Sequence, residues 1–310
     1  MVDEPAVRRA AVLGRPIAHS LSPALHRAAY RWLGLRWSYE AIDLAADELG
    51  AFLDGLDDDW VGLSLTMPLK ESVVPLLNAI DPLARTLRSV NTVLLTPAGR
   101  VGHNTDVPGL VSVLGEHGVL NPRTATVLGA GATARSAVAA LVAVGAERVA
   151  VCARRPESMP ELEQWVQQVA SASVGAARSA NGRVGPAVSM HPWDEAGGRL
   201  DAEVVVSTVP AGAVDHLVDR LVGRGESLGL LVDVVYDPSP TLLGAAWMSA
   251  GGPVAGGLEM LVHQALGQVT LMTGHEVPVS VLRGAGLAEL EARSHADGGR
   301  SRGAAGPPKQ

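Results

Sequence analysis

Strand-length apolar runs alternate with amphipathic stretches along the first hundred residues. The apolar runs are "AAVLG" (10–14), "WSYEAIDL" (37–44) and "WVGLSLTM" (60–67), and the amphipathic stretches are "SPALHRAAYRWLG" (22–34) and "ADELGAFLDGL" (46–56). Strands separated by helical patterns indicate βαβ units and a mostly parallel sheet flanked by helices. The pattern therefore predicts an α/β substructure over about residues 8–105.

A second alternation begins at "TATVLGAGATARSAVAALVAVGAERVAVCARR" (124–155) and continues through "EVVVSTVP" (203–210) and "LGLLVDVVYDP" (228–238). Its strand-length runs lie far enough apart for crossover helices, which predicts a separate doubly wound, Rossmann-type domain. The later stretch "GLEMLVHQALGQVTLMTG" (257–274) has apolar residues at helical spacing. We expect a helix there that could return across the domain boundary, and a disordered tail over 294–310.

Charge and cysteine content narrow the classes of function. The net charge of −7 leaves no basic face for a nucleic-acid backbone, so we expect no nucleic-acid partner. The single cysteine, Cys152, rules out an intramolecular disulfide and fits a reducing, cytoplasmic compartment. We expect no membrane segment and no metal, because the nine histidines lack the spacings of metal-binding motifs.

The stretch "VLGAGATARS" (127–136) follows an apolar run and opens an alanine-rich helix. Gly129, Gly131 and Ala134 form a G-x-G-x-x-A turn, whose small residues let the backbone approach a pyrophosphate while the helix N-terminus supplies N–H donors. A tight strand-to-helix turn without a ligand is the alternative.

About twenty residues later Arg154 and Arg155 stand where a dinucleotide-binding site contacts the ribose, and two guanidiniums suit the 2′-phosphate of NADP. A solvated arginine pair, or NAD with Glu157 as the acidic partner, stays open.

Four polar positions in the first half are candidates for substrate chemistry. Ser20 and Ser22 in "AHSLSP" (18–23) precede a helix, where hydroxyls and N–H groups can hold a carboxylate, although Ser22 could simply cap that helix. Lys70 follows an expected strand end, where α/β sites gather, although a solvated lysine is the commoner arrangement. Asp106 in "VGHNTDVPGL" (101–110) could accept a proton, orient Lys70 or cap the next helix.

With these residues laid out, the chain resembles the shikimate dehydrogenase family from about residue 10 to 280. The family pattern of S-x-S, N-V-T-x-P-x-K, A-V-N-T, N-T-D and a late G-L-x-M-L-V-x-Q helix is matched, in order, by "SLS", "SLTMPLK", "SVNT", "NTD" and "GLEMLVHQ". Ser64 is a departure, because it stands where the family usually has Asn.

The resemblance implies an α/β fold with a substrate domain at 1–106 and 257–293, a Rossmann NADP domain at 107–256, and C-terminal helices packed back on the first domain. It implies NADPH-dependent reduction of 3-dehydroshikimate to shikimate in the aromatic amino-acid (chorismate) pathway, with Lys70 and Asp106 as the catalytic pair. The implied substrate-binding residues are Ser20, Ser22, Thr66, Asn91, Asp106, Tyr236 and Gln264. The implied cofactor-binding residues are Gly129, Ala130, Gly131, Ala132, Thr133, Ala134, Arg154, Arg155, Thr208, Val209 and Gly257.

Two other functions stay open from the sequence. Quinate and aminoshikimate dehydrogenases share the scaffold, and some use NAD. A non-catalytic nucleotide-sensing protein would need only the turn at 127–136, and it would leave Ser20, Lys70 and Asp106 without a role. Either a monomer or a homodimer is compatible with the chain.

Overall fold

The computed structural model describes residues 8–154, 165, 168–169, 186–221 and 228–303, with side chains to residue 295. Its strands are β1 (Arg9–Gly14), β2 (Ser38–Asp43), β3 (Trp60–Leu65), β4 (Ala79–Ile80), β5 (Thr92–Thr96), β6 (Gly99–His103), β7 (Ala125–Leu128), β8 (Arg148–Ala153), β9 (Ala187–Pro192), β10 (Val204–Ser207), β11 (Leu230–Asp233) and β12 (Val254–Ala255). Its α-helices are α1 (Ser22–Trp32), α2 (Leu49–Asp54), α3 (Leu69–Ser72), α4 (Pro82–Leu87), α5 (Asp106–Glu116), α6 (Ala132–Ala143), α8 (Leu242–Ser249), α9 (Gly257–Thr273) and α10 (Val279–Gly303). The 3₁₀ turns are Val74–Leu76, Trp193–Arg199 and Asp215–Arg220.

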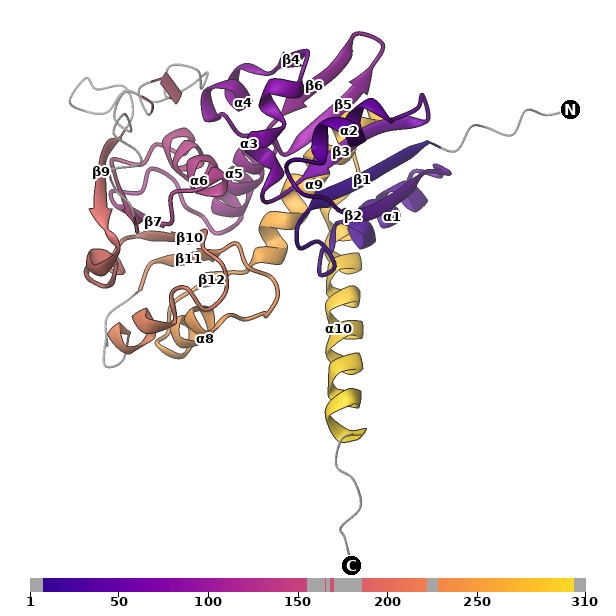
Figure 1. Cartoon of the computed structure of the whole chain (residues 1–310). Coiled ribbons are helices and arrows are strands. Elements are labelled where there is room, and N and C mark those ends of the chain that lie inside the picture. Colours follow the sequence, from indigo (N-terminus) through magenta and orange to yellow (C-terminus); the bar gives the residue numbers. More distant parts are fainter. Residues whose placement is uncertain (1–7, 155–164, 166–167, 170–185, 222–227, 304–310) are drawn as a thin grey trace, which may run out of the picture.

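The strands form two six-stranded sheets, which Figure 1 shows side by side. The first sheet has the order β2-β1-β3-β5-β6-β4 and is mixed, because β5 runs antiparallel to both β3 and β6. The expectation of a mostly parallel sheet holds for β1, β2 and β3, which are mutually parallel. The antiparallel excursion places the start of β5 and the end of β6 at the edge where β1 and β3 end.

The second sheet is parallel throughout and has the order β12-β11-β10-β7-β8-β9. The order reverses between β7 and β10, which makes this pair of strands the topological switch point of a doubly wound fold. Its strands are near-continuous apolar runs such as "ATVL" and "VVVS", as expected for a parallel sheet covered on both faces. The predicted Rossmann-type fold is confirmed.

The helix predicted at 257–274 is α9, and it links the two halves of the molecule. It begins beside β11, where Gly257 lies against the carbonyl of Val234, and then packs on α5, α1, β3 and β5 (Figure 1). A Cβ at Gly109 of α5 would lie 2.9 Å from the backbone nitrogen of Gln264 on α9. The missing side chain at Gly109 therefore lets the two helices approach closely and brings Gln264 to the first sheet.

The C-terminal helix α10 extends past residue 294, where the tail was expected to begin. Residues 294–303, expected to be disordered, continue α10, which projects away from the first half in Figure 1. Arg293 anchors the helix through its bonds to Glu289 and to the His19 and Ser20 carbonyls. Once a helix is anchored, each further residue adds a backbone hydrogen bond without a new nucleation cost. Among the helices of the described residues, none combines the length and apolar content needed to cross a membrane.

Candidate active site

A cavity of about 240 Å³ lies where the first sheet, α9 and the start of α6 meet. It collects residues from distant parts of the chain, from the loop after β1 to the middle of α9. Of the residues singled out from the sequence, its walls include Ser20, Ser22, Thr66, Lys70, Asp106, Thr133, Tyr236, Gly257 and Gln264. Residues as far apart in the sequence as Ser20 and Gln264 therefore line the same cavity.

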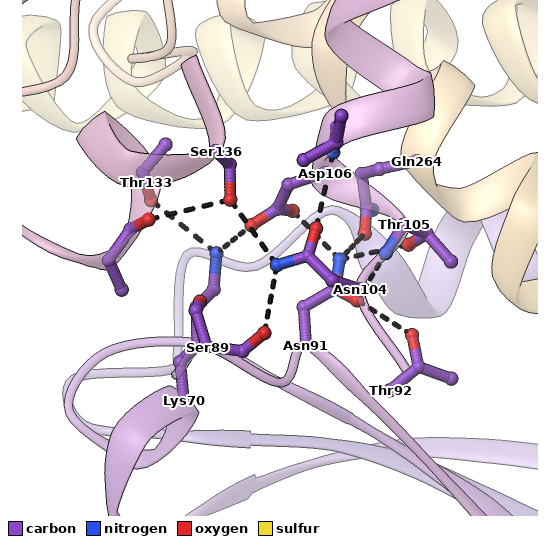
Figure 2. Close-up of polar contacts among 12 residues, drawn as sticks. Lys70, Ser89, Asn91, Thr92, Asn104, Thr105, Asp106, Thr133, Ser136 and Gln264 are labelled. Atoms are coloured by element: carbon purple, nitrogen blue, oxygen red, sulfur yellow. Dashed lines mark hydrogen bonds and ion pairs between the residues drawn. The ribbon is translucent and has the colours of Figure 1, made fainter. Parts of the chain in front are cut away.

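Lys70 lies on the short helix α3, just beyond the end of β3. Its ammonium nitrogen is 2.6 Å from Asp106 Oδ2 and 3.4 Å from Thr133 Oγ1 (Figure 2). The Lys70 side chain is 13% exposed and that of Asp106 is 4% exposed, so the ion pair is largely shielded from water while one side faces the cavity. This geometry excludes the ordinary solvated lysine, because the amine has a buried carboxylate partner.

Asp106 is the first residue of α5, and its carboxylate turns toward the cavity and away from the helix end. Thr105 is the N-cap residue without a capping bond of its own, and Asn104 Oδ1 accepts from the Val107 N–H of the first turn at 3.2 Å, so Asp106 is not the cap. Asn91 Nδ2 donates to Asp106 Oδ1 at 2.7 Å, while Lys70 donates to the other oxygen (Figure 2). Each carboxylate oxygen of Asp106 therefore has a donor of its own.

Asn91 lies behind the cavity wall and is 1% exposed. Its Oδ1 accepts from the Thr105 N–H at 2.8 Å, and its Nδ2 also donates to Gln264 Oε1 at 3.3 Å (Figure 2). The pairing of Thr92 with His103 between β5 and β6 places the segment Asn91-Thr92 beside the segment Asn104-Thr105. Asn91 thus reaches the cavity through Asp106 and Gln264, which line it.

Ser20 and Ser22 lie in the loop after β1 and at the first position of α1. Leu21 is the N-cap residue of α1 and Ser22 is its first helical residue, so Ser22 is not the cap that the alternative interpretation required. The Ser22 N–H donates to Ser20 Oγ at 3.3 Å, and Tyr236 forms a hydrogen bond with Ser20. Burial raises the pKa of the Tyr236 phenol, although the bond to Ser20 opposes this. Ser20, Ser22 and Tyr236 all line the cavity, and their hydroxyl groups can donate hydrogen bonds to a ligand there.

Among the cavity residues that were not identified as site residues from the sequence, Gln268 and Ser64 bond each other. Gln268 lies one turn after Gln264 on α9, and Ser64, noted only as a departure, lies in β3. Ser64 Oγ donates to Gln268 Oε1 at 2.8 Å and accepts from Tyr39 at 2.6 Å. The i, i+4 spacing of two glutamines among the apolar positions of α9 was the signal that could have found Gln268.

The glycine-rich turn lies at the carboxyl edge of the second sheet, at the switch point. Gly129 has a φ of +114°, and a Cβ there would lie 2.5 Å from Thr208 Oγ1 and 3.1 Å from Val209. Gly131 is the N-cap residue of α6, where no side chain caps the helix and a Cβ would meet only open space. The N–H groups at 132–134 therefore face a region that a phosphate could fill.

The other expected cofactor residues lie along the same edge. Arg154 follows β8 and is exposed, Thr208 and Val209 follow β10, and Gly257 follows β12 at the start of α9. Arg155 and Glu157 lie outside the described residues. Over the described ranges, no three His, Cys, Asp or Glu side chains gather as a metal ion would require.

Comparison with known proteins gives concordant results at three levels. Residues 12–93 match the family model described as the shikimate dehydrogenase substrate binding domain, and residues 257–285 match the shikimate 5′-dehydrogenase C-terminal domain. The chain is 32% identical to the shikimate dehydrogenase (NADP(+)) of Thermosynechococcus vestitus over 87% of this chain and 92% of that one.

Two solved structures extend the likeness to the fold. Mycobacterium tuberculosis shikimate dehydrogenase has a TM-score of 0.76 and 36% identity, covering 91% of this chain and 99% of that chain. The Thermus thermophilus shikimate 5-dehydrogenase in complex with NADP(H) and shikimate has a TM-score of 0.72 and 31% identity, covering 91% and 99%.

Proposed function

Because the chain belongs to the shikimate dehydrogenase family, we propose that it reversibly reduces 3-dehydroshikimate to shikimate with NADPH. The single observation that carries this proposal is the buried Lys70–Asp106 pair. The pair lines the cavity, and the Lys70 ammonium also contacts the hydroxyl of Thr133, which follows the glycine-rich turn. A proton-transfer pair is thereby held between the expected positions of substrate and cofactor.

The residues of the cofactor edge fit an NADP molecule. The positive φ of Gly129, the open space at Gly131 and the uncapped start of α6 leave room and donors for the pyrophosphate. Arg154 at the end of β8 would bind the 2′-phosphate, with Thr208, Val209 and Gly257 toward the nicotinamide. NADPH supplies the hydride to the ketone carbon when bound.

The protein's own groups then complete the reduction. As hydride adds to the carbon, negative charge grows on the carbonyl oxygen, and the Lys70 ammonium donates a proton to it. Asp106 and Asn91 hold that ammonium in place. Ser20, Ser22 and Tyr236 would bind the substrate carboxylate, while Thr66 and Gln264 would bind ring hydroxyls. In the reverse direction neutral Lys70 takes the proton from the hydroxyl.

The proposal is tested by oxidation assays on the purified full-length protein, following the absorbance of the reduced nicotinamide. We expect the highest kcat/KM for shikimate with NADP, and lower values for NAD or quinate. Faster oxidation of quinate, or faster oxidation with NAD, would assign the chain to the alternative dehydrogenase activities. Binding of NADP without oxidation of either compound would instead support the nucleotide-sensing protein.

A further inference from the structure

A buried polar network lies beneath the cavity, and the proposed reaction assigns it no role. Its centre is the Gln268 amide, which is 1% exposed. Gln268 Oε1 lies 2.8 Å from Ser64 Oγ and 3.2 Å from His26 Nε2, while Gln268 Nε2 lies 3.0 Å from the Asn91 carbonyl oxygen and 3.1 Å from Thr92 Oγ1. A buried amide with four partners is costly to leave partly unpaired, so its orientation is strongly constrained.

The direction of every bond in this network follows from one group. The Asn91 carbonyl can only accept, so the atom of Gln268 beside it must be the NH₂ nitrogen. Gln268 Oε1 then accepts from Ser64 and from His26, and Ser64 in turn accepts from Tyr39 at 2.6 Å. Burial lowers the pKa of His26 to about 3, so its ring is neutral and donates through Nε2. The network has a single consistent arrangement of donors and acceptors.

Gln268 holds Asn91 at two points. Its NH₂ donates to the peptide carbonyl of Asn91 and to the Thr92 hydroxyl, which itself donates to Asn91 Oδ1 at 2.9 Å. The Asn91 side chain then donates to Asp106, which holds Lys70 (Figure 2). The chain of contacts from Gln268 to the Lys70 ammonium is therefore continuous.

We infer that Gln268 is a positioning residue for the reaction proposed above: it fixes Asn91, and through Asn91 it fixes the Asp106–Lys70 pair. The inference rests on the proposed function, because that reaction uses the pair for proton transfer. Two of the four hydrogen bonds of Gln268 go to Asn91 and Thr92, on the side of this pair. The other two go to Ser64 of β3 and His26 of α1, and none goes to Ser20, Ser22 or Tyr236. Its loss therefore alters the chemical step more than substrate binding.

Gln268→Met tests the inference, because methionine keeps the length of the side chain and removes both donors. We expect kcat for shikimate oxidation to fall about tenfold, while KM for shikimate changes by less than about twofold. Tyr39→Phe is the matched control: it removes one hydrogen bond of the same network, at the far side of Ser64 from Asn91. We expect its kcat to match the wild type, even where its melting temperature falls as much as that of Gln268→Met.

Gln268→Glu is a second variant in case Gln268→Met does not fold. Glutamate keeps the size and an acceptor for Ser64 and His26 but carries at most one proton, so it cannot donate to both the Asn91 carbonyl and the Thr92 hydroxyl, and a loss of kcat in the same direction is expected. A folded Gln268 variant with wild-type kcat, or an equal kcat loss in Tyr39→Phe, overturns the inference and leaves the proposed function intact. A wild-type protein that oxidises no cyclitol overturns both.

Discussion

The two sheets contribute to the cavity in opposite ways. The first sheet presents buried side chains that already bond one another, with Asp106 and Asn91 at 3% and 1% exposure. The second sheet presents backbone and small residues, with Gly131 facing open space and Arg154 exposed. One region is a pre-organised polar network, and the other is a bare edge with room for a ligand.

This difference follows from what each region is proposed to bind. A small hydroxylated acid is best bound by donors and acceptors that are already fixed in place, because groups that are not fixed would have to reorganise at every turnover. A dinucleotide presents phosphates that backbone N–H groups and a helix N-terminus can hold without specific side chains. Substitutions should therefore act through chemistry in the first region and through backbone shape in the second.

The strongest test of the first region is Lys70→Met, which removes the proposed proton donor and keeps the apolar stem. We expect kcat to fall by about 10²–10⁴-fold, the range typical of lost general acid–base catalysis. NADP binding, measured by fluorescence titration, should stay near the wild-type value. Turnover close to that of the wild type in a folded variant would remove Lys70 from the catalytic assignment.

The counterpart in the second region is Gly129→Ala, which adds only a methyl group. Its Cβ would lie 2.5 Å from Thr208 Oγ1 at a φ of +114°, and such strain costs about 1–3 kcal/mol. We expect a lower melting temperature and weaker NADP binding, with the KM for shikimate little changed. Gly131→Ala is the control, because a Cβ there meets open space in the protein alone. Equal melting temperatures for the two variants would contradict the strain argument.

Arg154→Ala tests whether this edge also uses a side chain. Loss of a charge-assisted contact to the 2′-phosphate should raise the KM for NADP about tenfold and leave the KM for NAD unchanged. Arg148→Ala, at the opposite end of β8, is the matched control. An unchanged ratio of NADP to NAD efficiency would exclude the proposed contact.

The last prediction concerns acid sensitivity, which we expect in the first region. The pKa of His26 is lowered from 6.5 to about 3 by burial, with the bond to Gln268 opposing. As the pH falls below 6.5 the unfolded chain binds a proton at His26 that the folded chain does not, so stability declines by about 1.4 kcal/mol per pH unit. His26→Phe should reduce that slope in urea unfolding between about pH 6 and pH 4.5, whatever its absolute stability. An unchanged slope would show that another group governs this window.

The fold was largely predictable because its signals are local. The apolar runs and the glycine turn at 124–155 predicted β7, α6 and β8, and the spacing of apolar residues predicted α9. The family assignment from five ordered motifs is confirmed by the relatives. The disorder expected over 294–310 stays a prediction; in the structure α10, which Arg293 anchors, continues to Gly303.

The sequence by itself determined which functional groups are present: a lysine after a strand, an aspartate at the start of one helix, and a glycine turn before a second helix. Only the tertiary structure decided that these groups meet. The antiparallel excursion of β5 and β6 brings Asn91 and Asp106 to the edge where β3 ends. The close approach of α9 at Gly109 then adds Gln264 and Gln268. Periodicity reports only which face of an element is buried, whereas contacts between distant residues depend on how those faces pack together.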